Sequence, residues 1–368
     1  MKEPSFTMGI EEEYLLIDPE TRDLAKPPDE LMDAAKAKLG DRVTPEFMNA
    51  QIEVGTGICK TARQARSELV ELRATVAAIA ERYGCRLVAA STHPFANWQH
   101  QERSDKERYH QLRHEMQVLA ERLLISGMHV HCGLENDEFR IDAMNQVRYF
   151  LPHLLALSTS SPFWHGHETG LRCYRLSVFD EMPRSGLPSY FESWGEYQGT
   201  LELLAETGIM EDATKIWWDI RPHSKFPTLE MRICDVCTDV DDAVAIAALY
   251  VCLVRMLWRL RSLNQSWRVY PPFLIDENRW RAQRYGISDA LLDLGRRELV
   301  AFPALVEEIL SLVAEDAEAL DCTREVEHVR TILERGTSAD RQLAIHSEGG
   351  NQPLVDVVDW LARDTVAF

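Results

Sequence analysis

Positive charge is scarce in this sequence relative to negative charge. The 368 residues carry 40 Lys and Arg against 59 Asp and Glu, a formal net charge of -19 at pH 7. A protein with this charge repels nucleic acid and anionic lipid, so we expect neither as a partner. A phosphate-bearing ligand would need a locally positive site or a bound metal ion. The charge balance therefore makes a metal site the first possibility to consider.

The sequence also lacks the apolar segments of exported and membrane proteins. Residues 1–10 contain no continuous apolar segment behind Lys2, so they do not resemble a secretory signal. The most apolar stretch, residues 243–254, is too short to cross a bilayer and is followed directly by Arg255. We expect this stretch to form a buried helix of a soluble protein, whose 45% hydrophobic composition is sufficient for a large core.

The sequence also lacks glycine-rich nucleotide-binding motifs and a complete zinc-binding pattern, which limits how it can bind a ligand. The sequence has no GxxxxGKS/T and no GxGxxG motif, so no glycine-rich loop is available to grip a nucleotide. No export signal accompanies the eight cysteines, so we do not expect a disulfide framework. No second pair of Cys or His residues lies at the spacing that would complete a zinc site with Cys234 and Cys237. We therefore expect reduced, packed thiols in a cytoplasmic protein.

Hydrophobic periodicity predicts strands in the first two thirds of the chain and helices in the last third. The predicted strands are residues 8–18, 46–57, 85–91, 127–134, 216–222 and 228–235. The predicted helices are residues 31–38, 61–83, 105–124 and 141–157, and nearly all of 240–368. Residues 162–190 have the composition of a long functional loop. This order indicates an α+β protein with a mostly antiparallel sheet, formed as one large domain or two closely joined ones.

Each predicted strand has one apolar face and one polar face, because side chains alternate across a strand. The polar faces carry Glu11 and Glu13, Gln51 and Glu53, His129 and His131, Asp219 and Arg221 with Trp217, and Glu230 and Arg232. A single strand of this kind is more often an ordinary solvated surface. The agreement of five strands favours one concave surface lined by carboxylates and basic groups, with helices packed on the apolar side.

A divalent cation would explain why Glu11 and Glu13 point the same way. Neighbouring carboxylates raise one another's pKa, and a bound cation removes this conflict. Oxygen ligands with at most one imidazole suit Mg²⁺, or Mn²⁺, better than zinc. Mg²⁺ commonly keeps coordination positions open for substrate phosphates, so phosphate is the expected ligand. Glu12 lies on the opposite face, where we expect it to pair with an arginine on the helical side.

Seven short segments carry a family resemblance that spans nearly the whole chain. They are GIEEE (9–13), THPF (92–95), RY (108–109), GMHVHCG (127–133), WWDIRP (217–222), TLEMRICD (228–235) and RWRAQRYG (279–286). In this order they resemble the bacterial carboxylate–amine ligases of the glutamate–cysteine ligase type 2 family. The resemblance implies a fold related to glutamine synthetase, in which a curved antiparallel sheet forms a funnel for ATP, Mg²⁺ and an amino acid.

The resemblance also implies an activity and roles for individual residues. The activity is the ATP-dependent joining of the γ-carboxylate of glutamate to the amine of cysteine through an acyl phosphate, often weak in bacterial members. The residues implied near metal and phosphate are Glu11, Glu13, Glu53, His129 and Glu230. The basic groups implied to act on the reactants are Arg221 and Arg232. The resemblance also implies further residues of the nucleotide or substrate site, namely His131, Arg172, Arg175, Arg279 and Arg284.

Other functions stay open on the sequence alone. A metal-dependent hydrolase could use the same carboxylates and histidines to activate water between two ions. A non-catalytic nucleotide or metal sensor could retain the scaffold without the chemistry. The sequence leaves the physiological carboxylate and amine substrates undetermined, because loop shape around residues 162–190 sets them. The helical last third could bury an apolar face in a homodimer.

Overall fold

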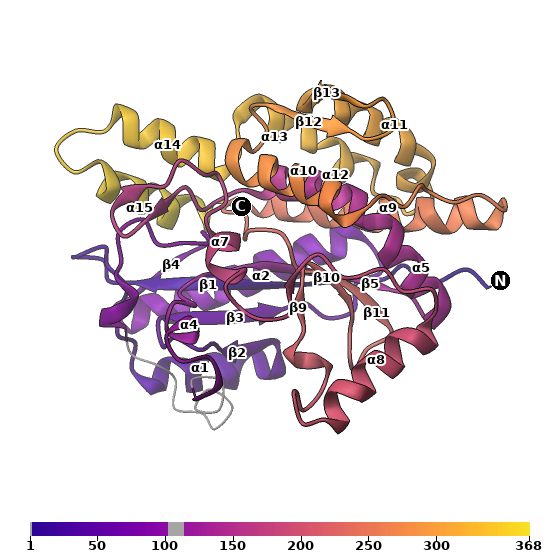
Figure 1. The fold of residues 1–368 in the computed structure, drawn as a ribbon. Coiled ribbons are helices and arrows are strands. Elements are labelled where there is room, and N and C mark those ends of the chain that lie inside the picture. Colours follow the sequence, from indigo (N-terminus) through magenta and orange to yellow (C-terminus); the bar gives the residue numbers. More distant parts are fainter. Residues whose placement is uncertain (1, 102–113) are drawn as a thin grey trace.

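The computed structural model describes residues 2–101 and 114–368, which are built around one antiparallel sheet (Figure 1). Within this part of the chain, the sheet has seven strands in the order β10-β11-β5-β1-β3-β2, and β4 pairs with the second half of β1. They are β1 (Met8–Ile17), β2 (Val43–Pro45), β3 (Gln51–Gly55), β4 (Arg86–Val88), β5 (Met128–Gly133), β10 (Ile220–Pro222) and β11 (Thr228–Met231). The predicted antiparallel sheet is therefore confirmed.

Helices surround this sheet and make up most of the last third of the chain. The first group is α1 (Asp29–Leu39), α2 (Ala62–Arg82), α4 (Val118–Glu121), α5 (Asp137–Val147), α6 (Leu151–Ser158), α7 (Arg175–Phe179) and α8 (Trp194–Glu206). The second group is α9 (Val240–Ser262), α10 (Pro272–Tyr285), α11 (Phe302–Ala319), α12 (Thr323–Glu327), α13 (Val329–Arg335), α14 (Ser338–Glu348) and α15 (Pro353–Asp364). In Figure 1, helices α10 to α15 lie together on the side opposite α1 and α8.

The apolar face of the sheet packs against α2, α5 and α9. Ile10, Val130 and Met231 project from three neighbouring strands into this layer and are fully buried. Among the described residues, α9 is the one helix long and apolar enough to span a membrane, and 78% of its apolar window is buried inside the protein. The prediction of a buried helix at residues 243–254 is therefore confirmed. All eight cysteines, each within the described ranges, are buried free thiols.

A fully buried ion pair fixes β1 to the helical layer. Glu12 and Arg73, on α2, are both 0% exposed, and the guanidinium donates to both carboxylate oxygens at 2.9 and 2.7 Å. The remaining Arg73 donors reach the carbonyl oxygens of Thr238 and Cys237 just before α9. Tyr14 donates its hydroxyl to the same carboxylate. The predicted arginine partner of Glu12 is thus confirmed, and it joins β1, α2 and the start of α9.

Two predicted strands are shorter than the sequence pattern indicated. The predicted strand 46–57 begins only at Gln51, because a turn interrupts the chain after the short strand β2. The predicted strand 216–222 breaks at Asp219 into β9 (Trp217–Trp218) and β10. β9 pairs in parallel with β8 (Ser185–Gly186), while β10 pairs with β11. Alternation counted through either break assigns side chains to the wrong face.

Three other predictions need correction or lie outside the description. The last third is interrupted by a hairpin of β12 (Ala290–Asp293) and β13 (Glu298–Ala301), so it is not almost wholly helical. The long loop at 162–190 holds short elements, including the pair β6 (Phe163–Trp164) and β7 (His167–Glu168). Residues 102–113, which contain the RY segment and most of the predicted helix 105–124, lie outside the described residues.

Removing the charge of Glu12 should strongly destabilise the protein. We expect Glu12→Gln to lower the free energy of unfolding by about 3–5 kcal/mol, because it leaves the buried Arg73 charge uncompensated. Urea unfolding followed by circular dichroism measures the change. The matched control is Glu307→Gln, which removes the exposed partner of Arg330 and should change the stability little. Equal effects of the two substitutions would contradict the assigned role of the buried pair.

A buried neutral histidine in the THPF segment links stability to pH. Burial lowers the pKa of His93 to about 4, although the carbonyl of Arg22 opposes this shift. Its Nε2 lies 2.8 Å from the Arg22 carbonyl oxygen, and its Nδ1 accepts the backbone N–H of Ala96 at 3.0 Å. Protonation of Nδ1 would remove that acceptor. The folded state therefore binds fewer protons than the unfolded state between about pH 4 and 6.5, and stability falls as the pH drops through this window.

His93→Gln should make the acid-induced loss of stability shallower. The titrating group contributes roughly 3 kcal/mol of that loss between pH 6.5 and 4, and the variant lacks it. The measurement is the free energy of unfolding across this pH range for the wild type and the variant. His167→Gln, at an exposed position on β7, serves as the control and should leave the slope unchanged. An unchanged slope in His93→Gln would refute the assignment.

Candidate active site

The register of the sheet brings the polar side chains of five strands onto one face. The directly opposite pairs are Glu11–His129, Glu13–Glu53, His131–Glu230 and Arg221–Glu230. Side chains directly opposite one another on antiparallel strands share a face, with Cβ atoms about 4.5–5.5 Å apart. The predicted convergence of carboxylates, histidines and arginines on one concave surface is therefore present in the structure.

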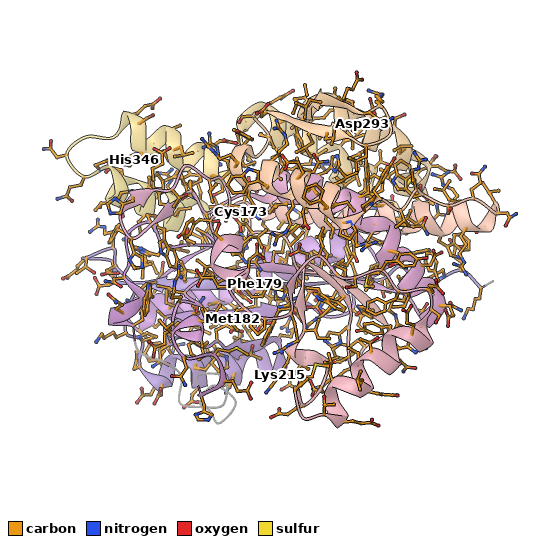
Figure 2. All side chains as sticks on the ribbon, viewed as in Figure 1. Cys173, Phe179, Met182, Lys215, Asp293 and His346 are labelled. Atoms are coloured by element: carbon orange, nitrogen blue, oxygen red, sulfur yellow. The ribbon has the colours of Figure 1, made fainter. Side chains whose placement is uncertain are left out.

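This polar face forms the floor of a cavity of about 700 Å³, within the size range of ligand sites. Its walls include Phe179 and Met182, around the end of α7, and Lys215, just before β9 (Figure 2). The predicted site residues that line it are Glu11, Glu13, Glu53, His129, Arg175, Arg221, Glu230 and Arg232. Tertiary structure thus brings together residues that are up to 221 positions apart in the chain, from Glu11 to Arg232.

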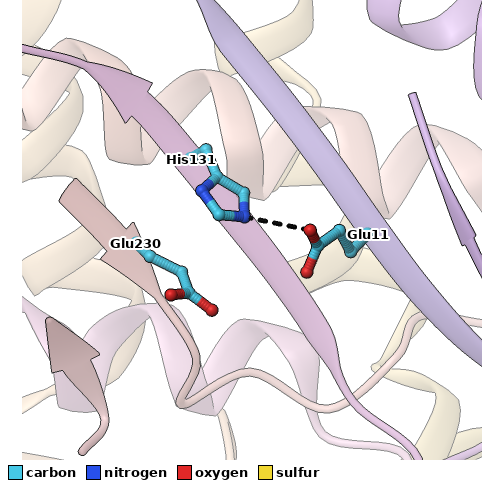
Figure 3. Close-up of side chains that lie close together, drawn as sticks. All are labelled: Glu11, His131 and Glu230. Carbon is cyan, nitrogen blue, oxygen red and sulfur yellow. Dashed lines mark ion pairs between the residues drawn. The ribbon is translucent and has the colours of Figure 1, made fainter. Parts of the chain in front are cut away.

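Glu11, His131 and Glu230 form a compact group of potential metal ligands (Figure 3). One ligand atom from each lies within 4.8 Å of the other two. The Nε2 atom of His131 is 3.3 Å from a carboxylate oxygen of Glu11, yet it is buried without a hydrogen bond to any described residue. Its Nδ1 lies 3.1 Å from the hydroxyl of Thr228. A proton held on Nδ1 leaves the Nε2 lone pair free for a metal ion.

Basic groups keep Glu230 and Glu11 ionised. Burial opposes the ionisation of Glu230, but the charges of Arg232 and Arg221 hold its pKa well below the usual range. Arg221 donates from Nε at 2.8 Å, and Arg232 donates from Nη1 to the other oxygen. Burial also opposes ionisation of Glu11, but the adjacent imidazoles of His129 and His131 hold its pKa well below the usual range. This side of the cavity is therefore largely neutralised by the protein itself.

Three carboxylates on the other side of the cavity are not neutralised to the same extent. Burial and the charge of Glu53 raise the pKa of Glu13 to about 7. Burial raises the pKa of Glu53, and burial with the charges of Glu13 and Glu53 raises that of Glu46. Carboxylates held together in this way are stabilised by a divalent cation, whose charge lowers all three pKa values.

Glu46 is a site residue that the sequence analysis missed. Alternation through a continuous strand 46–57 places it with Ile52 on the apolar face, opposite Glu53. In the structure, residues 46–50 form a turn, and Glu46 lines the cavity beside Glu53. The signal that could have located it is Pro45, which is unfavourable inside a strand and marks the end of β2.

His129 lies deeper in the site and is neutral. Burial and the charge of Arg232 lower its pKa to about 4, although Glu11 opposes this shift. Its Nδ1 lies 3.2 Å from a carboxylate oxygen of Glu11, and its Nε2 lies 3.9 Å from an oxygen of Glu13. His129 therefore bridges the neutralised side of the cavity and the acidic side.

Arg175 reaches the cavity by packing over a glycine. Its guanidinium donates to the carbonyl oxygens of Ile233 and Arg232 at 3.3 and 3.2 Å. A Cβ atom at Gly127, directly before β5, would collide with this guanidinium, so a larger residue there would displace Arg175. The backbone N–H of Gly127 in turn donates to Glu13 at 2.7 Å. Arg175 thus supports the strand ends beneath the acidic side of the cavity.

Other predicted arginines do not line the cavity and bind other parts of the protein. Arg172 pairs with Asp340 at 3.0 Å, and Arg284 donates to the carbonyl oxygen of Gly170. The prediction that these two line the nucleotide site is therefore not supported. Arg279 also lies outside the cavity. Its contacts show that the predicted position of Asp219 on the cavity face is wrong. It binds Asp219 at 2.7 Å, so Asp219 is turned away from the cavity face rather than sharing that face.

The residues present fit a hard divalent cation such as Mg²⁺ or Mn²⁺. The donors are carboxylate oxygens with one imidazole nitrogen, the ligand set that suits these ions. The buried, unpartnered Nε2 of His131 and the raised pKa of Glu13 both indicate a ligand position that protein contacts alone do not satisfy.

Replacing one carboxylate on the acidic side of the cavity should stabilise the metal-free protein and reduce the stabilisation that metal binding provides. Without divalent metal, we expect Glu46→Gln to raise the free energy of unfolding at pH 7 by roughly 1 kcal/mol, because it relieves carboxylate repulsion. With Mg²⁺ or Mn²⁺, the variant should gain less thermal stability than the wild type. Differential scanning fluorimetry with titrated metal measures both effects. Glu71→Gln, in an exposed ion pair with Arg42, is the control. A metal response in Glu46→Gln equal to that of the wild type would contradict the site.

Comparison with known proteins identifies relatives along the full chain. The model of the family described as "Glutamate-cysteine ligase family 2(GCS2)" matches residues 7–356. A protein of Rhodospirillum rubrum named "Putative glutamate--cysteine ligase 2" is 54% identical over 378 residues, covering 100% of this chain and 97% of the relative. A protein of the same name from Jannaschia sp. is 55% identical over 365 residues, covering 98% of this chain and 96% of the relative.

Solved structures show the same fold at low sequence identity. The glutamate–cysteine ligase of Francisella tularensis, in complex with AMP, has a TM-score of 0.68 at 14% identity, covering 100% of this chain and 90% of that one. A bifunctional glutathione synthetase from Pasteurella multocida has a TM-score of 0.70 at 16% identity, covering 98% of this chain and 52% of that one. The family match and the closely similar relatives agree along the whole sequence, and the chain belongs to glutamate–cysteine ligase family 2.

Proposed function

We propose that this protein is an ATP-dependent carboxylate–amine ligase that joins the γ-carboxylate of glutamate to the amine of cysteine. The observation that carries the proposal is the cavity lined by Glu11, Glu230, Arg221 and Arg232, with His131 beside Glu11 and Glu230, in a member of this family. A site rich in carboxylates binds a triphosphate only with bound cations. The combination therefore suits phosphoryl transfer from a metal-bound nucleotide.

The proposed reaction has two steps. In the first, a γ-carboxylate oxygen of glutamate attacks the γ-phosphorus of ATP, the bond from phosphorus to ADP breaks, and an acyl phosphate forms. In the second, the cysteine amine attacks the acyl carbon, inorganic phosphate leaves, and the nitrogen loses a proton. Catalysis of the first step rests mainly on positioning and on stabilising the negative charge of the transferred group.

The arginines on the cavity floor suit this stabilising role. Arg232 holds Glu230 through Nη1, and its buried Nε has no hydrogen-bond partner among the described residues. This free donor can meet an oxygen of the transferred phosphoryl group. Arg221, held by Glu230 and by the carbonyl oxygen of Ile216, adds positive charge to the same wall. Glu230 thereby positions both guanidinium groups.

The cofactor and the cellular setting complete the proposal. Mg²⁺ or Mn²⁺, when bound, would neutralise phosphate charge between the two halves of the cavity. Glu11, His131 and Glu230 would hold one such ion, and Glu13, Glu46 and Glu53 would bind another. We place the protein in the cytoplasm, where its free thiols would stay reduced. We treat residues 1–368 as one catalytic domain, and a homodimer through the helical third is also part of the proposal.

Glu11→Gln should abolish amino-acid-stimulated release of phosphate from ATP. We expect wild-type protein with Mg²⁺ to release phosphate when glutamate and cysteine are present together. The variant should lose at least about 100-fold in rate, because one ligand of the central metal group is removed. Glu20→Gln, on an exposed turn after β1, is the matched control and should retain full activity. A coupled assay for ADP, with thermal melting to verify folding, makes the measurement.

The same assay separates the proposal from the competing functions. A screen of other carboxylates and amines shows whether a different pair stimulates ATP cleavage more strongly. Hydrolysis of an ester or amide without ATP would instead identify a metal-dependent hydrolase. Binding of Mg²⁺ and ATP without turnover of any substrate pair would identify a non-catalytic nucleotide-binding protein. Full activity of Glu11→Gln would refute the assigned site even if ligation occurs.

A further inference from the structure

An exposed phenylalanine lies at the rim of the candidate active-site cavity. Phe226 is in the turn between β10 and β11, it lines the cavity, and it is 58% exposed. No other exposed large hydrophobic residue in the described ranges lines this cavity. An exposed ring forgoes the free energy that burial would provide, and neither metal binding nor phosphoryl transfer needs such a ring. The chemistry of the metal ligands and arginines therefore leaves Phe226 without a role.

His223 holds this ring in a fixed orientation. The two rings are stacked, with centroids 4.8 Å apart and planes inclined by 12°. The Nδ1 atom of His223 accepts the backbone N–H groups of Lys225 and Phe226 at 3.2 and 3.1 Å. The backbone N–H of Thr228 donates to the carbonyl oxygen of Phe226 at 2.7 Å. Because His223 covers one face of the phenylalanine ring, the exposed area belongs to the other face and the edge.

The same turn is connected to the group of potential metal ligands shown in Figure 3, which includes His131. The ring of His223 lies 5.3 Å from that of His131, measured between centroids, at an interplanar angle of 72°. Thr228, directly after the turn, has its hydroxyl 3.1 Å from Nδ1 of His131. Exposure rises along this series of rings, from the buried His131 to Phe226. The phenylalanine ring is therefore two ring-to-ring contacts away from a metal-ligand position, on the solvent side.

One of the proposed reactants has a part that fits such a surface. Glutamate and cysteine contain no aromatic ring, whereas ATP carries a planar purine that is joined through ribose to its phosphates. Every nucleobase has a π-face that can stack on an aromatic side chain. With the phosphates at the metal ligands, the ribose separates them from the base, as the ring of His223 separates Phe226 from His131. The turn, residues 223–227, contains no acidic residue that would repel the nucleotide.

We propose that Phe226 is the stacking platform for the base of the nucleotide bound in this cavity. The base would cover the open face of the ring, opposite His223, while the phosphates lie at the metal ligands. This inference rests on the proposed function, because it takes ATP as the ligand, and it deepens that function by assigning a position to the base. A stacking contact also adds affinity in a chain that has no glycine-rich loop to grip the phosphates.

Isothermal titration of the full chain in Mg²⁺ with two ligands tests the proposal. The β,γ-imido analogue of ATP carries the base, whereas tripolyphosphate carries phosphates alone. We expect Phe226→Ala to weaken binding of the analogue by about tenfold and to leave the affinity for tripolyphosphate unchanged. Phe226→Leu, which keeps an apolar side chain without a ring, should weaken the analogue by a similar factor, and Phe226→Trp should retain wild-type affinity. Phe273→Ala, at an 80% exposed phenylalanine on α10, is the matched control and should change neither affinity.

Four results would overturn the proposal. Binding of the analogue by the wild type no more tightly than tripolyphosphate would show that the base makes no contact. Unchanged affinity of Phe226→Ala for the analogue, or equal weakening of both ligands, would show that the ring does not act on the base. Wild-type affinity of Phe226→Leu would indicate an apolar contact without stacking. Thermal melting of each variant verifies folding.

The titration is independent of ligation, because it contains neither glutamate nor cysteine. The expected loss of affinity in Phe226→Ala, in a protein that never joins the two amino acids, would support the platform and refute the proposed ligase activity. Ligation by a protein in which Phe226→Ala binds the analogue as tightly as the wild type would refute the platform alone.

Discussion

The buried ion pair between Glu12 and Arg73 is the constraint on which the site depends. Successive residues of a strand point to opposite faces, so a shift of one residue in β1 would exchange its two faces. Glu12 is anchored inside the helical layer by two hydrogen bonds to Arg73, whose other donors hold the segment before α9. This contact makes any other register costly. It thereby forces Glu11 and Glu13 onto the opposite face, where they line the cavity.

The cavity is divided electrostatically into two parts with different tasks. Around Glu11 and Glu230, the charges of Arg221 and Arg232 and the neighbouring imidazoles already stabilise the ionised carboxylates. Around Glu13, carboxylates raise one another's pKa and leave the charge conflict unresolved. The first arrangement holds a defined geometry before any ligand arrives, and the second gains stability only when a cation binds. Together they suit a site that binds metal and nucleotide in a fixed relation.

The helical third supports this site from outside. Arg279, on α10, binds Asp219 through Nε and Nη2 and binds Asp180 through Nη1 and Nη2. Asp180 directly follows α7, whose end contributes Phe179 to the cavity wall, and Asp219 precedes the strand that carries Arg221. One buried guanidinium thus fixes two wall segments to α10. The family resemblance assigned Arg279 to the nucleotide or substrate site, but in the structure its role is to hold these two wall segments in place.

The sequence by itself determined the class of fold, the polar face of the sheet and most of its site residues. Period-two alternation within short strands such as β5 and β11 is local, so it can be counted without knowing the fold. Tertiary structure alone decided the rest. The turn after β2 and the break between β9 and β10 depend on long-range strand pairing. The turn places Glu46 in the cavity, and the break turns Asp219 away from it. The partners of Arg172 and Arg284 are distant in sequence or are backbone carbonyls, and neither kind of contact leaves a periodic signal in the chain.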